Sequence, residues 1–175
     1  FSPTLGLQEW DAYESGAIPA ALQTYVEQLR RADALARVYP TWWYGLPAML
    51  KGYFDRIWLP GVAFGLAFDG TVITHELANI RALFVVTTYG APAIFIRLFM
   101  GDPGQRMLRR GLPRLFARGC RTTWCAMYGL DGSRPEQRER FRTRTRRAAV
   151  AALNFRGLRR PGTAARTGQA PGARG

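Results

Sequence analysis

Lysine, histidine and cysteine are nearly absent from this chain of 175 residues. Lys51 is the only lysine, His75 is the only histidine, and the two cysteines are Cys120 and Cys125. A protein zinc site needs several cysteine or histidine ligands at short spacing, so we expect no metal site. Two thiols without a Cys-x-x-Cys spacing are typical of free cysteines in a reducing compartment, which favours the cytoplasm.

Long apolar runs are also missing. No stretch of eighteen apolar residues occurs, so no transmembrane helix and no membrane insertion are expected. No signal-peptide pattern opens the chain. Its apolar content of 47% and its length fit one globular domain with a substantial core. The first residue is Phe rather than Met, which leads us to expect that an N-terminal portion precedes it.

Acidic residues are scarce beyond residue 60, and the net charge is +13. Residues 1–60 hold five basic and six acidic side chains, whereas the remainder holds 20 basic and six acidic ones. The segment Phe155 to Gly175 has five arginines, no acid and many small residues, which predicts a disordered basic tail. Charge alone favours weak binding to polyanions, but no motif supports a specific nucleic acid partner. A solvated basic face is the simpler interpretation.

Alternating helical and extended patterns predict the fold class. They favour α/β: a doubly wound parallel sheet in three layers, α/β/α. The expected strands are 34–39, 81–88 and 121–128, and the expected helices are 8–14, 18–32, 47–58, 95–116 and 136–153. The helix 95–116 is interrupted at residues 101–104, with Arg109, Arg110, Arg114 and Arg118 on its outer face. Arg37 interrupts the first strand, where an unpaired buried cation would be costly.

Three consecutive aromatic residues, Trp42, Trp43 and Tyr44, follow the first strand. A consecutive run cannot all point into one core, so some of these rings must face something else. A hydrophobic seam between two copies is one interpretation, and a cleft that stacks a planar ligand is the other.

A second candidate loop, Thr87 to Gly90, follows the strand 81–88. Loops after parallel strands open on the same edge of a sheet, so the two loops are expected to lie together. His75 lies in a connection, where a lone histidine is more often structural or solvated than catalytic.

The segment 39–52, YPTWWYGLPAMLKG, with Ala32–Asp33 and Asp55–Arg56, resembles the signature of the flavodoxin-like NAD(P)H:quinone oxidoreductases. The PGVAF at 60–64 and the VVTTYG at 85–90 are similar to later blocks of that family, in the same order. The likeness runs from about Phe1 to Leu153. It implies a flavodoxin-like sheet with a flavin, FMN or FAD, at the carboxyl-terminal edge of its strands.

What the resemblance implies for the site can be stated residue by residue. Pro40, Thr41, Trp42, Trp43, Tyr44 and Gly45 would contact the isoalloxazine ring. Thr87, Thr88, Tyr89 and Gly90 would flank its pyrimidine side.

The implied reaction is a two-electron, ping-pong hydride transfer from NAD(P)H through flavin N5 to a quinone or similar aromatic acceptor. A cytoplasmic homodimer is the implied assembly. The alternative is an ancillary regulatory flavoprotein subunit of a potassium efflux system, for which the arginine-rich second half could serve in docking. A nucleic-acid-binding module, a third possibility, would require tight, salt-sensitive binding that survives removal of 155–175.

Two departures from the family pattern stand out. The stretch Pro92 to Asp102 has Phe95 and no histidine, so no catalytic residue can be carried over and these remain unknown. The family's first strand, its phosphate-holding loop and its second strand have no counterpart here. We therefore expect residues 1–154 to form a partial flavin-binding domain that is N-terminally incomplete, followed by the basic tail 155–175.

Overall fold

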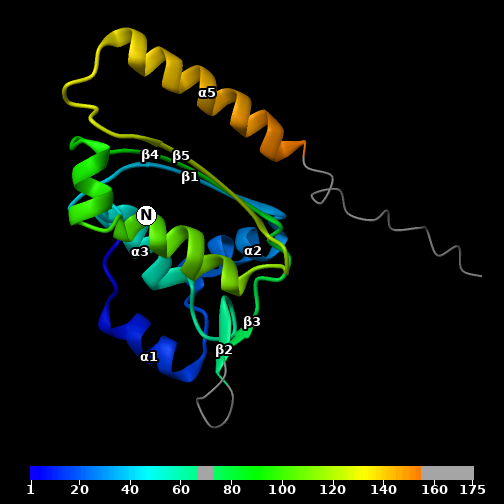
Figure 1. Ribbon diagram of the computed structural model, residues 1–175. Helices are drawn as coiled ribbons and strands as arrows, with labels where there is room; N and C mark the ends of the chain where they lie inside the picture. Colours follow the sequence, from blue (N-terminus) through cyan, green and yellow to red (C-terminus); the bar gives the residue numbers. More distant parts are fainter. Residues whose placement is uncertain (67–72, 155–175) are drawn as a thin grey trace, which may run out of the picture.

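Three parallel strands form the centre of the computed structural model, which describes residues 1–66 and 73–154 (Figure 1). The strand order is β1-β4-β5, with β1 at Ala34–Pro40, β4 at Ala82–Thr88 and β5 at Arg121–Met127. In this register Pro40 lies beside Thr88, and Thr88 lies beside Met127. All three predicted strands are therefore confirmed. The predicted tail at 155–175 lies outside the described residues.

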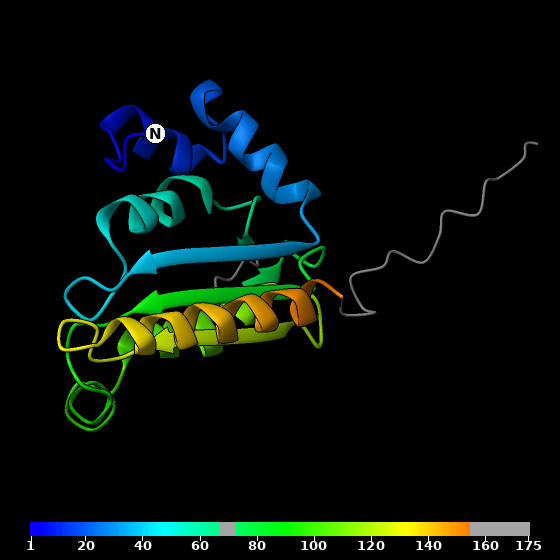
Figure 2. The same ribbon diagram turned by 90° about the horizontal axis from the view of Figure 1, so that it is seen from above.

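Helices cover the sheet on both faces, as the predicted three-layer α/β/α arrangement requires. Helix α5 (Pro135–Leu153) crosses one face alone, whereas α2 (Gln23–Arg31) and α3 (Ala48–Ile57) lie on the other, with α1 (Leu7–Ser15) farther out (Figures 1 and 2). The remaining elements are the short helices η1 (Ala20–Leu22), η2 (Phe95–Phe99), α4 (Pro103–Arg106), η3 (Met107–Gly111) and η4 (Leu112–Leu115), and the strands β2 (Phe64–Leu66) and β3 (Ile73–His75).

The main core lies between the sheet and the layer of α2 and α3. The helices contribute apolar side chains three or four residues apart, which face the sheet together, and strand β4 contributes alternate residues from the sheet. Burial of each such side chain contributes about 1.5–3 kcal/mol. The core includes Leu22, Val26, Leu29, Ile57, Leu83, Val85 and Leu108.

A partly buried ion pair attaches α1 to α3. Arg56 donates from Nε to Glu9 Oε2 at 2.8 Å, and its two Nη groups contact Glu9 Oε1 and the carbonyl of Ser2. The hydrogen bond from Arg56 lowers the pKa of Glu9. Gly52 leaves room for the backbone of Pro3, because a Cβ there would collide with it. The N-terminal segment is thus fastened over α3.

Two regions differ from the sequence-based expectation. Phe64–Leu66 and Ile73–His75 pair as an antiparallel hairpin, β2–β3, where no strand was predicted. The predicted helix 95–116 is irregular: η2 and η3 are π-helical turns, and η4 is a 3₁₀ turn. The proline at position 113 and the glycines at 101 and 111 disfavour a continuous α-helix there.

Arg37 occupies the middle of β1, which lies at the edge of the three-stranded sheet. Its guanidinium lies 4.8 Å from the ring centre of Tyr53 and 5.7 Å from that of Phe54, both on α3. Burial lowers the pKa of Arg37. The cation–π contacts offset part of the cost of desolvating the Arg37 guanidinium, which made an arginine in this strand unexpected.

Candidate functional site

A tight turn of four residues follows β1 directly. The backbone N–H of Gly45 donates to the carbonyl of Trp42 at 2.8 Å, and the N–H of Trp42 donates back to Gly45 at 3.2 Å. The two central residues, Trp43 and Tyr44, have φ angles of 48° and 62°. Paired positive φ angles are the mark of a type I′ turn, which asparagine and glycine normally fill.

Aromatic residues in this turn are strained. Holding a non-glycine residue in the left-handed region costs about 1–3 kcal/mol, and it persists where the surroundings demand it. The side chain of Trp43 is 91% exposed, so burial of its ring does not stabilise this conformation. Strain without burial points to a ligand-binding role for the turn.

The turn after β4 lies beside this aromatic turn, as the sequence predicted. The N–H of Thr41 donates to the carbonyl of Thr88 at 2.9 Å, and the hydroxyls of Thr41 and Thr87 are 2.8 Å apart. The N–H of Tyr89 in turn donates to Met127 of β5 at 2.7 Å. The two loops are therefore joined at one edge of the sheet by direct hydrogen bonds.

An open hollow of about 210 Å³ lies between the two turns. Five of the ten predicted site residues line it: Thr41, Trp43, Tyr44, Tyr89 and Gly90. Ala91 and Ile96 complete the lining and were not predicted. The other five predicted residues lie just behind or outside the hollow: Pro40 and Thr88 pair within the sheet, Thr87 is buried, Gly45 closes the turn, and Trp42 is exposed.

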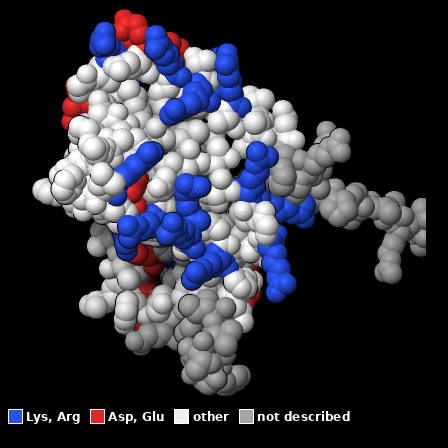
Figure 3. All heavy atoms as spheres, in the orientation of Figure 1, with Lys and Arg blue, Asp and Glu red and all other residues white. Residues whose placement is uncertain are grey.

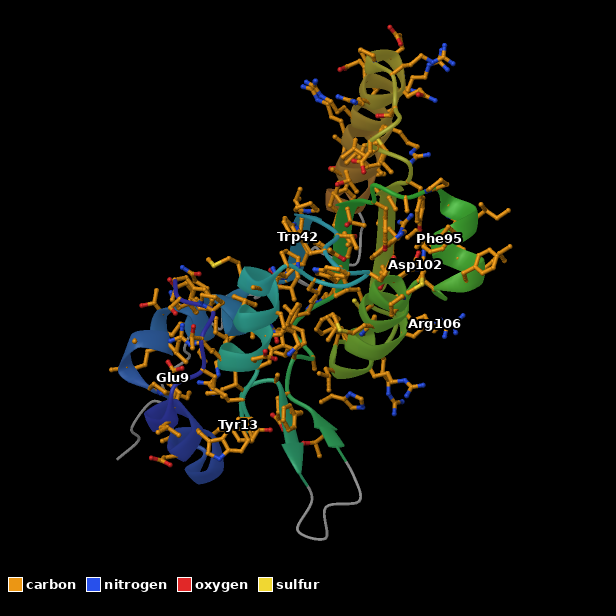
Figure 4. The ribbon with its side chains drawn as sticks, turned by 90° about the vertical axis from the view of Figure 1, so that its left-hand side faces the viewer. Glu9, Tyr13, Trp42, Phe95, Asp102 and Arg106 are labelled. Atoms are coloured by element: carbon orange, nitrogen blue, oxygen red, sulfur yellow. The ribbon has the colours of Figure 1, made fainter. Side chains whose placement is uncertain are left out.

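Asp102 organises the floor of this region, and sequence reasoning missed it. It is 3% exposed and accepts hydrogen bonds of 2.7 Å from the hydroxyls of both Tyr89 and Tyr128. The two tyrosine rings stack at 4.6 Å. Burial, followed by the hydrogen bond to Asp102, raises the pKa of each tyrosine. Asp102 thereby connects the loops that follow β4 and β5 to the helical segment 95–115 (Figure 4).

One sequence signal could have revealed Asp102. The run Gly101-Asp102-Pro103 places an acidic residue directly before a proline that begins a helix, which is a typical N-cap position. The Asp102 carboxylate does accept a hydrogen bond from the N–H of Gln105 at 3.2 Å. Its φ of 44° adds a third strained residue near the hollow.

His75 lies away from this hollow. It is exposed on β3 and pairs with Phe64. It lines a separate hollow together with Ala78 and residues 113, 114 and 116–120, which precede β5. The described residues contain no group of three potential metal ligands, and none of their helices is long and apolar enough to cross a membrane. Cys120 and Cys125 are both free thiols.

The hollow has the features that a flat heteroaromatic ring needs. Among the described residues, none accepts a hydrogen bond from the backbone N–H groups of Trp43 or Tyr44, so both donors are free for a ligand. Tyr44 lines the hollow, and the ring of Phe95 lies 6.3 Å from its ring, at the edge of the hollow. The carboxylate of Asp131, on an exposed side chain, packs closely against Gly90, where a Cβ would meet it. These residues fit a flavin ring, although contact with flavin stays a prediction for each of them.

Known proteins with similar sequences are oxidoreductases by name. An uncharacterized NAD(P)H oxidoreductase of Escherichia coli (strain K12) is 37% identical over 90 residues, which are 51% of this chain and 42% of the relative. The human ribosyldihydronicotinamide dehydrogenase [quinone] is 28% identical over 94 residues, covering 53% of this chain and 39% of the relative. The matches thus span less than half of these curated relatives.

Solved structures agree with the sequence matches. The NAD(P)H:quinone oxidoreductase from Methanothermobacter marburgensis is 27% identical, with a TM-score of 0.72, and the alignment covers 85% of this chain and 75% of that one. The family with the flavodoxin-like fold matches residues 1–153. The family resemblance noted in the sequence is therefore confirmed, and this chain belongs to the flavodoxin-like fold family.

Proposed function

We propose that this chain is the ring-binding part of a flavin-dependent NAD(P)H:quinone oxidoreductase that acts in the cytoplasm. Residues 1–154 form its domain, with FMN or FAD at the hollow between the two turns. NAD(P)H is the hydride donor, and a quinone or similar small aromatic is the acceptor. The names of the similar proteins support this reaction class. The strained, solvent-facing aromatic turn beside a hollow is the observation that carries the proposal.

When bound, the flavin supplies two-electron hydride chemistry in ping-pong order, and the protein supplies orientation and electrostatics. The free N–H groups of Trp43 and Tyr44 would donate to the ring edge and stabilise negative charge on it. The rings of Tyr44 and Phe95 would exclude water from one side. The hydroxyl protons of Tyr89 and Tyr128 are already donated to Asp102, so these tyrosines hold the shape of the floor.

The first experiment is a binding titration with FMN and with FAD, followed by absorbance in the flavin bands. We expect a shifted spectrum, and oxidation of NAD(P)H when benzoquinone is added. Tyr44→Ala should weaken flavin binding, whereas Trp42→Ala, which alters an exposed neighbour outside the hollow, should not. A protein that leaves the spectra of both flavins unchanged would rule out the proposal.

An exposed apolar surface beside the hollow favours a homodimer. Ile94, Leu98 and Phe99 are 65%, 74% and 77% exposed, and Phe95 stacks on Phe99 at 5.8 Å. Because Phe95 also faces Tyr44, this surface continues to the edge of the hollow. A second copy bound here would cover the ring. Sedimentation should give a dimer that Leu98→Arg dissociates, and a wild-type monomer at high concentration would contradict this assembly.

A further inference from the structure

A second, larger hollow of about 410 Å³ lies next to the first and is lined mainly by arginines. Lys and Arg side chains gather on this face over the helical segment 103–115 (Figure 3). The hollow is lined by Arg97, Gly101, Asp102, Gln105, Arg106, Arg109 and Arg110.

The positive charge of this hollow is not neutralised by the protein. Asp102 is its only acidic lining residue, and both carboxylate oxygens are occupied by the two tyrosine hydroxyls. Among the described residues, no carboxylate forms an ion pair with Arg106, Arg109 or Arg110. Several guanidinium groups that share one hollow repel one another, and a bound anion would relieve that repulsion.

The hollow is shaped by its backbone. A Cβ at Gly101, whose φ is +68°, would lie 2.7 Å from Nη2 of Arg106, so glycine lets this guanidinium lie close to the loop. Arg109 and Arg110 belong to the π-helical turn η3, and Arg97 to the π-helical turn η2. Single π-helical turns are frequent at functional sites. Arg97 is further held over the ring of Tyr128 at 4.8 Å.

The two hollows share a wall. Tyr89 lines the first hollow and donates through its hydroxyl to Asp102, which lines the second. Ile96 lines the first, and the next residue, Arg97, lines the second. A ligand with a ring in one hollow can therefore place an attached anionic group in the other.

We infer that the arginine hollow binds a phosphate group of a nucleotide that is bound at the neighbouring hollow. Guanidinium groups recognise phosphate through paired, charge-assisted hydrogen bonds, and several of them converge here. Which nucleotide this is rests on the proposed function: either the nicotinamide nucleotide, with a preference for NADPH over NADH, or the flavin itself.

Calorimetric titration with adenosine 2′,5′-bisphosphate tests the site without flavin or turnover. The double variant Arg106→Gln/Arg109→Gln should bind about tenfold more weakly or worse, as expected when charge-assisted hydrogen bonds are lost. The control Arg142→Gln/Arg146→Gln removes the same charge from α5, and it should bind like the wild type. Equal losses in both doubles, or no loss in either, would overturn the inference.

Two further measurements identify the phosphate. If Arg106→Gln/Arg109→Gln raises KM for NADPH and leaves KM for NADH unchanged, the hollow is assigned to the nicotinamide nucleotide. If the same double variant binds FMN only as weakly as it binds riboflavin, which lacks the phosphate group, the hollow is assigned to the flavin. If the protein binds the bisphosphate through these arginines but shows no flavin binding, the phosphate site stands and only the proposed reaction fails.

Discussion

The two ends of the sheet are built in different ways. At the end where the strands begin, Leu77, Ile80 and Phe116 are buried, and the chain is held by backbone hydrogen bonds such as Arg81 N–H to Asp33 and Ala117 N–H to Ile80. At the end where the strands finish, exposed aromatic rings and two hollows replace that packing.

Within the described residues, backbone strain from positive φ angles is found only at the second of these ends. The described residues hold three non-glycine residues with positive φ, and all three, Trp43, Tyr44 and Asp102, border the hollows. Burial of apolar side chains where the strands begin stabilises the fold and offsets the strain where the strands finish. Substitutions at the two ends should therefore separate stability from ligand binding.

The largest expected effect on stability is at the apolar end. Ile80→Ala should lower the free energy of unfolding by about 3 kcal/mol, because it leaves a cavity in a fully buried site. Urea unfolding measures this loss. Flavin affinity of the folded variant should not change, and Leu7→Ala, at a position 87% exposed, serves as the control. A large fall in affinity would show that the two ends are coupled.

Removal of Asp102 should affect both properties. Asp102→Ala leaves two buried tyrosine hydroxyls without their acceptor and should cost about 2–3 kcal/mol. Asp102→Asn keeps one acceptor oxygen and tolerates the left-handed backbone, so it should recover part of the stability. Unfolding and flavin titration of both variants measure this. Equal behaviour of the alanine and asparagine variants would contradict the proposed connection.

Relief of strain should have a smaller effect, of opposite sign on the two properties. Trp43→Gly removes the penalty of a positive φ and should raise stability by about 0.5–1 kcal/mol while weakening flavin binding. Trp42→Gly is the matched control, because Trp42 does not have a positive φ, whereas its neighbours Trp43 and Tyr44 do. If Trp43→Gly is no more stable than Trp42→Gly, the turn is not strained.

The smallest expected effect is the pH dependence at Cys120. Burial raises the pKa of this thiol from 9.0 to about 11. The folded state therefore holds the proton more tightly than the unfolded state, and this contribution to stability is lost as pH rises from about 9 to 11. Cys120→Ala should flatten the stability profile in that window. An unchanged slope would show that the thiol is not protected by folding.

The fold was more predictable than the site. Continuous apolar runs such as Leu83–Val86 identify a strand covered on both faces, and the helical stripes of α2 and α3 identify the layer beneath it. The β2–β3 hairpin was missed because three-residue strands leave almost no periodicity. The irregular segment 95–115 keeps a helical pattern even though its hydrogen bonding changes to π and 3₁₀ turns.

Only part of the candidate site was open to sequence reasoning. The two loops could be predicted because parallel strands bring them to one edge. The run Gly101-Asp102-Pro103 indicates only that Asp102 caps a helix. Its second role, as acceptor for the hydroxyls of Tyr89 and Tyr128, depends on residues 13 and 26 positions away along the chain, so the local pattern does not reveal it. The arginine hollow was likewise hidden within what looked like a solvated basic face.

The position of Arg37 has a consequence for the protein in concentrated solution. In the described part of the chain, β1 has no partner along its outer side, and Val38 on this strand is 75% exposed. An unpaired edge strand can form hydrogen bonds with a strand of another molecule. An inward-pointing charged residue on the edge strand commonly prevents such aggregation. In this chain by itself, replacing Arg37 with leucine would therefore remove a desolvated cation and favour precipitation.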